Sequence, residues 1–318
     1  MTRVGATSRI AQDFVLSAHR KGRTFGLYAR RPEAVAAFLA AHGLPAAWAR
    51  GTLEDFARAK SPFAGIVNCV GVGDPARARA MGADIFAATS SSDDLALAHL
   101  GHFPQVPYLF LSSGAVYGAA FDRPADADTH ARLPVNALGA QDQYGIAKLH
   151  AEARHRALTG RTIIDLRVFN YVSRTLDCDA RFLITDMVRA IRDSRVFETT
   201  DQPLVRDYLH PEDFCALALA CLKAPAGTNM AVDAYSRAPI DKRALLALMA
   251  AEFGLRHRFV AAAAAVNATG AKPFYYSTSR AAAALGYAPT RSSAEAIREE
   301  VGAILGRAAP APLMAASC

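Results

Sequence analysis

The first half of the chain alternates short apolar runs with longer segments in which apolar residues recur every three or four positions. This alternation is typical of repeated strand–helix units, which assemble into a parallel sheet with helices on its faces. The helical segments at 32–43 and 91–101 each end in a glycine, a common helix terminator. The sequence predicts strands near residues 2–5, 24–28, 46–50, 65–70, 107–112 and 162–168.

Beyond about residue 170, helical segments joined by proline-containing connectors replace this alternation, at 182–193, 241–254 and 292–305. A chain of 318 residues is long enough for a large domain with a smaller one attached. We expect an α/β fold in which residues 1–171, with a later strand from about 205–235, form a doubly wound parallel sheet of the Rossmann type. Residues 172–318 then form most of a smaller, mainly helical C-terminal lobe.

The composition argues against several classes of protein. Hydrophobic residues make up 52% and charged residues 20%, values typical of an ordered globular protein. No run of about 18 uncharged apolar residues occurs, and the N-terminus lacks the apolar core of a secretion signal. The five cysteines are scattered and form neither a CxxC pair nor a cluster with histidines. We expect a soluble cytoplasmic protein with reduced thiols, no membrane partner and no metal site.

The charge balance is basic, with 36 Lys and Arg against 29 Asp and Glu, a formal net charge of +7. The two signs are interspersed, and no basic run with interleaved aromatic residues occurs. This pattern argues against nucleic acid as a partner. An anionic small-molecule ligand accounts for the excess of arginine equally well.

The segment GATSRIA at 5–11 follows the first apolar run and precedes a helical pattern, where a dinucleotide-binding turn belongs. In a GxxGxxG turn the glycines let backbone N–H groups approach a pyrophosphate at the helix N-terminus. Here Gly5 keeps its place, while Ser8 and Ala11 replace the other two glycines. Small residues such as Thr7 and Ser8 still admit phosphates, although an ordinary strand-to-helix turn fits the same letters.

The second predicted strand is followed by Arg30 and Arg31, where an acidic residue would bind the ribose hydroxyls of NAD. Two guanidinium groups at this place suit a 2′-phosphate, to which arginine makes bidentate, charge-assisted hydrogen bonds. The sequence therefore favours NADP over NAD. The alternative is that both arginines begin a solvated helix.

The residues that carry chemistry are Tyr144 and Lys148 on a predicted helix and Ser113 at the end of a predicted strand. Residues four apart share one helix face, so the Lys148 ammonium can lie near the Tyr144 phenol. A nearby cation lowers the pKa of a phenol and makes proton exchange feasible near neutral pH. Ser113 would hydrogen-bond a substrate oxygen whose charge changes during hydride transfer. Taken alone, a Tyr-xxx-Lys pair is more often a surface feature than a site.

Together these segments resemble the extended short-chain dehydrogenases/reductases, which include nucleotide-sugar epimerases, dehydratases and reductases. The similarity spans nearly the whole chain in the family's order. It is carried by GATSRIA at 5–11, NCVGVGDP at 68–75, LSSGAVYG at 111–118, YGIAK at 144–148, RVFNYV at 167–172, RDYLHPEDF at 206–214 and LGYAP at 285–289.

The resemblance implies catalytic roles for Ser113, Tyr144 and Lys148, and a substrate-binding role for Ser113 and Gly114. It also implies that Asn170 and Arg206 contact the phosphates of a nucleotide-linked sugar, although Arg206 in a surface ion pair and Asn170 as a turn cap are the alternatives. The residues implied to line the cofactor, beside Tyr144 and Lys148, are Arg9, Ile10, Thr52, Leu53, Val70, Gly71 and Phe169.

Two departures from the family pattern bear on function. Thr52 replaces an acid on the adenine side of the cofactor site, so the choice of cofactor is open. Gly114 and Ala115 occupy the places of an acid pair in family dehydratases, which disfavours dehydration. In the second lobe Tyr208, His210, Phe274 and Tyr275 are candidate pocket residues, but such residues more often serve packing.

The leading hypothesis is an NADPH-dependent reductase, or dehydrogenase, of a nucleotide-linked 4-keto-6-deoxysugar. The alternative is a nucleotide-sugar epimerase that retains NAD, and the third is a non-catalytic nucleotide-binding protein. By resemblance, a homodimer through residues 84–102 and 144–158 is plausible.

Overall fold

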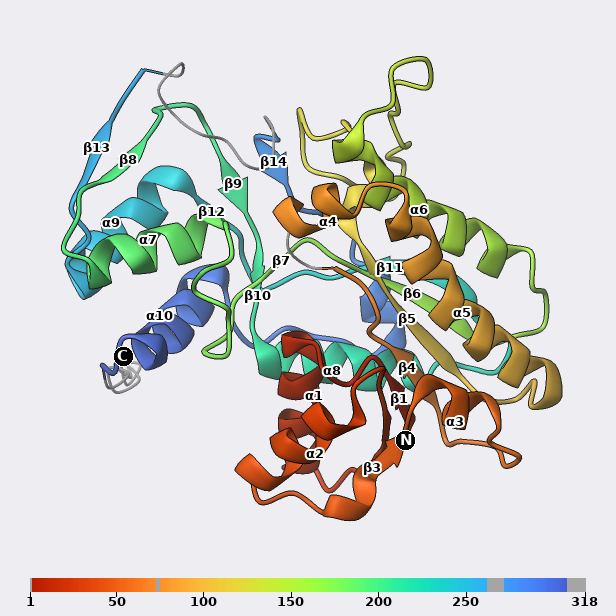
Figure 1. Cartoon of the computed structure of the whole chain (residues 1–318). Helices are drawn as coiled ribbons and strands as arrows, with labels where there is room; N and C mark the ends of the chain where they lie inside the picture. Colours follow the sequence, from red (N-terminus) through yellow and green to blue (C-terminus); the bar gives the residue numbers. More distant parts are fainter. Residues whose placement is uncertain (1, 73–74, 262–271, 308–318) are drawn as a thin grey trace, which may run out of the picture.

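The structure is a computed structural model that describes residues 2–72, 75–261 and 272–307. Within them, seven parallel strands form the central sheet in the order β11-β6-β5-β4-β1-β2-β3 (Figure 1). Because the chain runs outward from β1 in both directions, the order reverses between β1 and β4, and this is the doubly wound topology predicted from the sequence. The strands are β1 (Thr2–Val4), β2 (Gly26–Tyr28), β3 (Ala49–Gly51), β4 (Ile66–Asn68), β5 (Tyr108–Ser113), β6 (Ile163–Val168) and β11 (Asn229–Asp233).

The predicted strand near 46–50 begins later than expected. A 3₁₀ helix, η1 (Ala46–Trp48), occupies its first residues, and the strand β3 covers only Ala49–Gly51. Pro45 starts a tight turn in which the Trp48 N–H donates to the Pro45 carbonyl at 3.0 Å. The turn buries Trp48 in the core, so the apolar run that indicated a strand is partly a turn.

Helices cover both faces of the sheet (Figure 1). One face packs against α1 (Arg9–His19), α2 (Pro32–Ala41) and α8 (Pro211–Leu222), whose Phe14, Phe38 and Phe214 lie in one core. The other face packs against α3 (Leu53–Ala57), α5 (Asp84–His102) and α6 (Ala140–Arg156). The short helix α4 (Pro75–Met81) precedes α5 and contacts α6. No helix in these residues combines the length and apolar character of a membrane span.

A second lobe has its own core, formed by α7 (Leu183–Arg192), α9 (Lys242–Phe253) and α10 (Ser293–Ile304). Local signals set these helix ends: Ser292 and Glu295 form a capping box before α10, and Gly254 ends α9 with φ 74°. Short strands outside the central sheet form three small sheets: β7 (Asn170–Tyr171) with β10 (Tyr208–Leu209), β9 (Val205–Arg206) with β12 (Ile240–Asp241) and β14 (Phe274–Tyr275), and β8 (Phe197–Thr199) with β13 (His257–Phe259).

Candidate active site

Ser113 lies at the carboxyl end of β5, and Tyr144 lies in the first turns of α6. Gly145 lets the helix approach the 3₁₀ helix η2 (Gly114–Tyr117), because a Cβ at Gly145 would lie 2.4 Å from the Ala115 carbonyl oxygen. This close approach brings the two hydroxyl groups near each other, and the Ser113 hydroxyl acts to lower the Tyr144 pKa. The serine, itself nearly buried, also accepts a hydrogen bond from the Ala115 N–H at 3.2 Å.

The prediction of a lowered Tyr144 pKa is wrong for this structure. Burial raises the pKa of the Tyr144 phenol, the nearby phenol of Tyr275 raises it further, and only the Ser113 hydroxyl works the other way. Lys148 is not the source of a lowered pKa because its ammonium is engaged elsewhere. It donates to the carbonyl oxygens of Leu111 at 2.8 Å and Val70 at 3.4 Å.

Lys148 is a fully buried cation whose direct hydrogen-bond acceptors are neutral carbonyl groups. Its ammonium lies 4.3 Å from the centre of the Phe110 ring. Burial lowers the pKa of Lys148 to about 8, although more distant carboxylates, Asp93 first among them, oppose the shift. Gly71 gives the ammonium room, since a Cβ there would lie 3.3 Å from Nζ. The lysine is therefore poised to change its charge near physiological pH.

An aromatic cluster of Phe121, Phe169 and Tyr275 adjoins these hydroxyl groups. Phe169, expected to line the cofactor, packs against Gly114, where a Cβ would lie 2.3 Å from the ring. Tyr275 comes from β14 of the second lobe and places its phenol oxygen 3.4 Å from Ser113 Oγ. Ser113 therefore meets two phenols, one from each lobe.

The residues at the end of β1 fit a dinucleotide. Gly5 has φ 79°, and a Cβ there would lie 2.7 Å from Val70, so the turn passes close to the end of β4. Ser8 precedes α1 and its side chain makes no capping hydrogen bond, so the serine hydroxyl does not compete with a phosphate for the N–H groups at this helix N-terminus. Arg9 and Ile10 open that helix, and Ile10 packs on the core. Gly5, Val70 and Gly71 thus meet where the strand order reverses.

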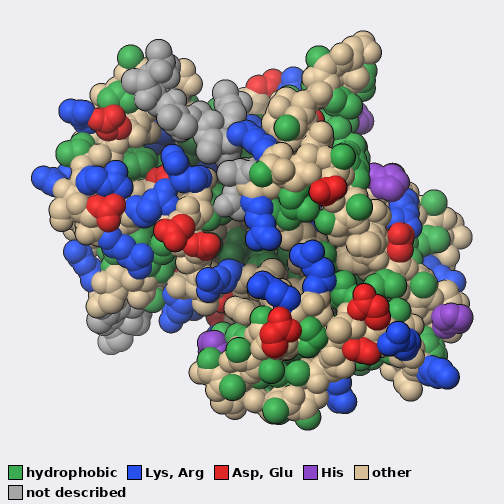
Figure 2. All heavy atoms as spheres, in the orientation of Figure 1, with side chains coloured by type: hydrophobic (Ala, Val, Ile, Leu, Met, Phe, Trp, Pro, Cys, Tyr) green, Lys and Arg blue, Asp and Glu red, His purple; other side chains and the backbone are tan. Residues whose placement is uncertain are grey.

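A hollow of about 420 Å³ next to this turn is lined by Thr7, Arg30, Arg31 and Arg77. Arg30 and Arg31 follow β2, as predicted, while Arg77 comes from α4. Figure 2 shows Lys and Arg side chains gathered around the recess in the middle of the visible face. Three guanidinium groups on one hollow make an anion-binding surface.

Thr52, expected to line the adenine side of the cofactor, caps a helix in this structure. Its hydroxyl accepts from the Asp55 N–H and donates to the Asp55 carboxylate, a capping box at the start of α3. Leu53, the first residue of that helix, packs against the core. The structure therefore uses the Thr52 hydroxyl to begin a helix.

Arg206 and Asn170 lie where β9 and β7 enter the second lobe. The buried Arg206 guanidinium donates to the carbonyl oxygens of Val205, Lys272 and Pro273, at 2.8, 2.8 and 3.3 Å. It is not in a surface ion pair with Asp207, which accepts instead from Ser236 and Ser293. Asn170 donates to the backbone carbonyl of Tyr275 at 3.0 Å and so holds β14 in place.

Comparison with known families decides the classification. Residues 4–232 match the NAD dependent epimerase/dehydratase family. The chain belongs to that family. This confirms the resemblance to extended short-chain dehydrogenases/reductases, and with it the predictions of an enzyme with a Rossmann-type fold that uses a nicotinamide adenine dinucleotide. No curated protein sequence matches the chain.

Solved structures of nucleotide-sugar enzymes share the fold of this family member. UDP-glucose 4-epimerase from Bifidobacterium longum, in complex with NAD+ and UDP, superposes with a TM-score of 0.75 at 16% identity, covering 96% of this chain and 97% of that one. UDP-N-acetylglucosamine 4-epimerase from Methanobrevibacter ruminantium, in complex with UDP-N-acetylmuramic acid, has a TM-score of 0.75 at 13% identity (96% and 98% covered). MoeE5 in complex with UDP-glucose and NAD has a TM-score of 0.73 at 18% identity (96% and 98% covered).

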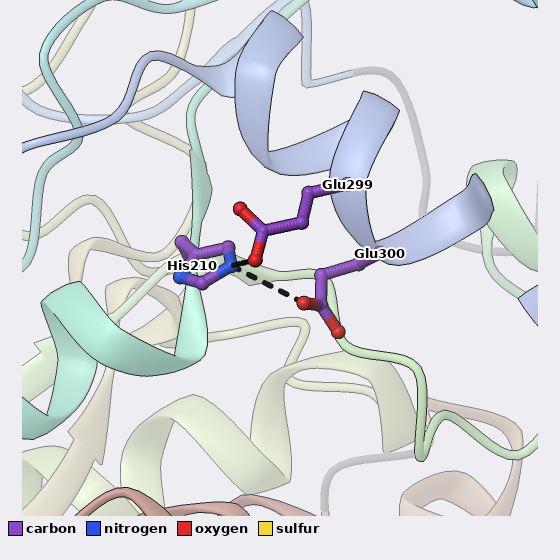
Figure 3. Close-up of side chains that lie close together, drawn as sticks. All are labelled: His210, Glu299 and Glu300. Carbon is purple, nitrogen blue, oxygen red and sulfur yellow. Dashed lines mark ion pairs between the residues drawn. The ribbon is translucent and has the colours of Figure 1, made fainter. Parts of the chain in front are cut away.

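A cluster of His210, Glu299 and Glu300 joins α8 to α10 of this epimerase/dehydratase family member (Figure 3). His210 Nδ1 accepts the Glu212 N–H at 3.1 Å, so a neutral imidazole carries its proton on Nε2. Nε2 lies 3.4 and 3.2 Å from the two carboxylates, ion-pair distances at which its N–H aligns poorly for a hydrogen bond. A protonated nitrogen has no lone pair for a metal, and Arg174 already pairs with Glu300. The Glu300 ion pair in this cluster is therefore the one with Arg174.

The other second-lobe candidates differ in placement. Tyr208 is buried in the core of the second lobe, and Phe274 precedes Tyr275 in β14. Two cations at the family site were missed by sequence reasoning: Arg77, and Lys272, whose ammonium lies 5.1 Å from the Tyr275 ring. Arg77 was detectable, since it follows the carboxyl end of a predicted strand; Lys272 was not, because its segment has no periodic pattern.

Proposed function

We propose that this protein is an epimerase that inverts one carbon of a nucleotide-linked sugar with a dinucleotide that it retains between turnovers. The observation that carries the proposal is the meeting of Ser113 and Tyr144 at the end of β5, beside the buried Lys148. The epimerases among the similar folds favour inversion over the reductase that the sequence placed first.

The chain's own residues supply the proton chemistry. A bound NAD or NADP supplies a hydride acceptor that can also give the hydride back. Loss of hydride from a carbinol carbon requires loss of the hydroxyl proton, which Tyr144 would accept as a phenolate and later return. Ser113 donates a hydrogen bond to the same oxygen while its charge changes. Burial raises the Tyr144 pKa without a ligand, so the positive charge of a bound oxidised dinucleotide would have to lower it. Return of the hydride to the opposite face of the keto sugar inverts the carbon, and the net reaction consumes no cofactor.

The phosphates of the substrate have a positively charged site. Within the described residues, no carboxylate lies at ion-pair distance from Arg206, whose hydrogen bonds go to neutral carbonyl groups. Lys272 lies close enough for Arg206 to help lower the Lys272 pKa, after burial. Arg206 is buried and Lys272 half-buried, and neither forms an ion pair with a carboxylate in the part of the chain that the structure describes, although Asp142 acts on Lys272 from a distance. Such a pair of cations favours binding of an anion such as a diphosphate.

The cofactor preference that we propose is NADP, because Arg30, Arg31 and Arg77 line one hollow beside the dinucleotide turn. Replacing Arg31 by Ala is expected to weaken NADP binding by roughly tenfold and to leave NAD binding unchanged, as one charge-assisted hydrogen-bond donor is lost. Calorimetric titration of both dinucleotides measures this. Arg23→Ala, at the opposite end of β2, is the matched control.

This exposed arginine hollow also supports the second candidate, a reductase that exchanges NADPH. Purified protein is assayed with a panel of nucleotide sugars and 4-keto-6-deoxy derivatives. An epimerase brings two isomers to equilibrium without net loss of reduced nicotinamide, whereas a reductase consumes one NADPH per product. Dinucleotide binding without either reaction contradicts both and supports the non-catalytic hypothesis.

A further inference from the structure

The Ser113 hydroxyl stands at a junction of three polar groups. The Ala115 N–H donates to Oγ at 3.2 Å, the Tyr275 phenol oxygen lies 3.4 Å from it, and the Tyr144 phenol lies near enough for Ser113 to lower its pKa. The last distance is long for a hydrogen bond between hydroxyl groups, as is common in catalytic sites before substrate binds. The same serine therefore contacts both phenols of the site.

Several contacts fix the place of Tyr275. Its backbone carbonyl accepts from Asn170, and it is paired with Arg206 in the parallel register of β14 and β9. Its ring packs edge-to-face on Phe121 and Phe169, with ring centres 4.7 and 5.4 Å apart. Burial raises the pKa of its phenol, so the group stays a hydrogen-bond donor across the working range of pH.

The hydrogen-bonding capacity of the Ser113 hydroxyl indicates how the Tyr275 phenol affects it. A serine hydroxyl has one proton and two acceptor lone pairs. The Ala115 N–H occupies one lone pair. If Tyr275 donates to the other, the only remaining direction for the serine proton is toward the reaction centre and Tyr144. Without the Tyr275 hydroxyl, the Ser113 hydroxyl can rotate and point a lone pair, in place of its proton, toward the reaction centre.

We infer that Tyr275 is a positioning residue for hydride transfer: its phenol donates to Ser113 Oγ and so aims the single Ser113 proton at the reacting sugar oxygen. The inference rests on the proposed function and adds a residue from the second lobe to it. Tyr275 acts through Ser113, in contrast to Tyr144, which exchanges the proton itself.

The kinetic test replaces Tyr275 by Phe, which keeps the ring contacts and removes only the hydroxyl. We expect kcat to fall about tenfold, the effect of one lost hydrogen bond, while KM for the nucleotide sugar changes by less than about twofold. The acid limb of the kcat profile moves to higher pH, because a less well oriented Ser113 stabilises the Tyr144 phenolate less. Tyr276→Phe, the same change one residue along the chain, leaves both quantities unaltered.

A double substitution tests the route of the effect. If Tyr275 acts through Ser113, Tyr275→Phe costs nothing further once Ser113 is Ala. A packing role predicts equal losses in both backgrounds, which overturns the inference, as does a Tyr275→Phe enzyme with unchanged kcat and pH profile.

A measurement without turnover separates this inference from the proposed function. Protein labelled with ¹³C at the phenolic carbon of tyrosine gives a resonance that reports hydrogen bonding of each phenol. The Tyr275 resonance, identified by its loss in Tyr275→Phe, is expected to shift in Ser113→Ala, and that of Tyr276 is not. An unshifted Tyr275 resonance refutes the hydrogen bond. A shifted one in a protein that converts no nucleotide sugar leaves the hydrogen bond standing and refutes the proposed function.

Discussion

Helix α6 carries two buried cationic groups about two turns apart, and the protein surrounds them in opposite ways. Lys148 has carbonyl groups and an aromatic ring around its ammonium, and burial lowers its pKa to about 8. For His155, burial also opposes the charge, but Asp165 at 2.6 Å and Asp93 at 2.8 Å outweigh it and raise the pKa to about 9. The charge of Lys148 is therefore poorly compensated by its neighbours, whereas two carboxylates more than compensate that of His155.

This difference distinguishes a residue of the proposed active site from one that stabilises the fold. Around His155, the Tyr108 phenol donates to Asp93, Arg156 pairs with Asp165, and Asn229 caps the end of the helix. Such a network fixes the packing of α6 on the sheet, because any missing partner leaves a buried charge alone. Lys148 lacks these partners and stays sensitive to what binds beside it, the property expected of a site residue.

The largest expected effect is on turnover. Lys148→Met should lower kcat by roughly 10²-fold or more, the lower end of what a positioned acid–base group contributes. The free energy of unfolding should stay unchanged or rise, because an apolar side chain replaces a poorly compensated charge. Steady-state kinetics and urea denaturation measure the two effects. Lys60→Met is the control at an exposed lysine, and an active Lys148→Met enzyme contradicts the catalytic role that the family resemblance implies for Lys148.

The second effect is on folding. His155→Leu should lower the free energy of unfolding by about 3–5 kcal/mol, because Asp93 and Asp165 lose the charge between them. The control is His150→Leu, an exposed histidine on the same helix that should change stability little. Equal losses for the two variants in urea denaturation show that the network contributes no more than a surface residue.

The third effect is the pH dependence of stability, in which the two cations have opposite signs. His155 has a folded pKa raised from 6.5 to about 9, so its stabilisation is complete below pH 6.5 and is lost as pH rises to 9, by about 3 kcal/mol. Lys148 has a pKa lowered from 10.5 to about 8, so its contribution to stability increases between those values as the folded state gives up a proton first.

The two variants separate the contributions of His155 and Lys148 to the pH dependence of the free energy of unfolding. His155→Leu should abolish the fall that begins near pH 6.5, and Lys148→Met should abolish the rise above about pH 9, where the loss from His155 has ended. A wild-type profile that is flat from pH 6.5 to 8 is incompatible with a charged His155 in the folded protein.

The smallest effect is expected where the network reaches the surface. Arg154 pairs with the exposed Asp94 at 2.5 Å and with Asp93 at 3.4 Å, and a third of its side chain is exposed. Arg154→Ala should cost no more than about 1 kcal/mol, because solvent screens such pairs. Thermal unfolding compared with His155→Leu measures it, and a loss as large as that of His155→Leu shows that the network extends outward.

Sequence reasoning succeeded where local pattern decides the structure. The strand ends and the helix spacing were enough to bring Ser113 and Tyr144 together, since both depend on short-range periodicity. The spacing did not show that the Lys148 side chain extends toward the Leu111 carbonyl instead of toward Tyr144. Residues four apart lie on the same helix face, but their side chains need not point the same way. Tyr275 lies on a strand of two residues whose position comes only from pairing with β9, so no periodic signal marks it.

Gly145 has a consequence for how the enzyme accommodates different ligands. With no side chain between α6 and the Ala115 carbonyl, the serine and the first phenol belong to one rigid body and share its thermal motion. Tyr275 arrives on a separate, short segment. Structures with bound ligands and NMR relaxation measurements should therefore find the backbone of β14 shifting from one sugar to another, while Ser113 and Tyr144 keep their relative positions.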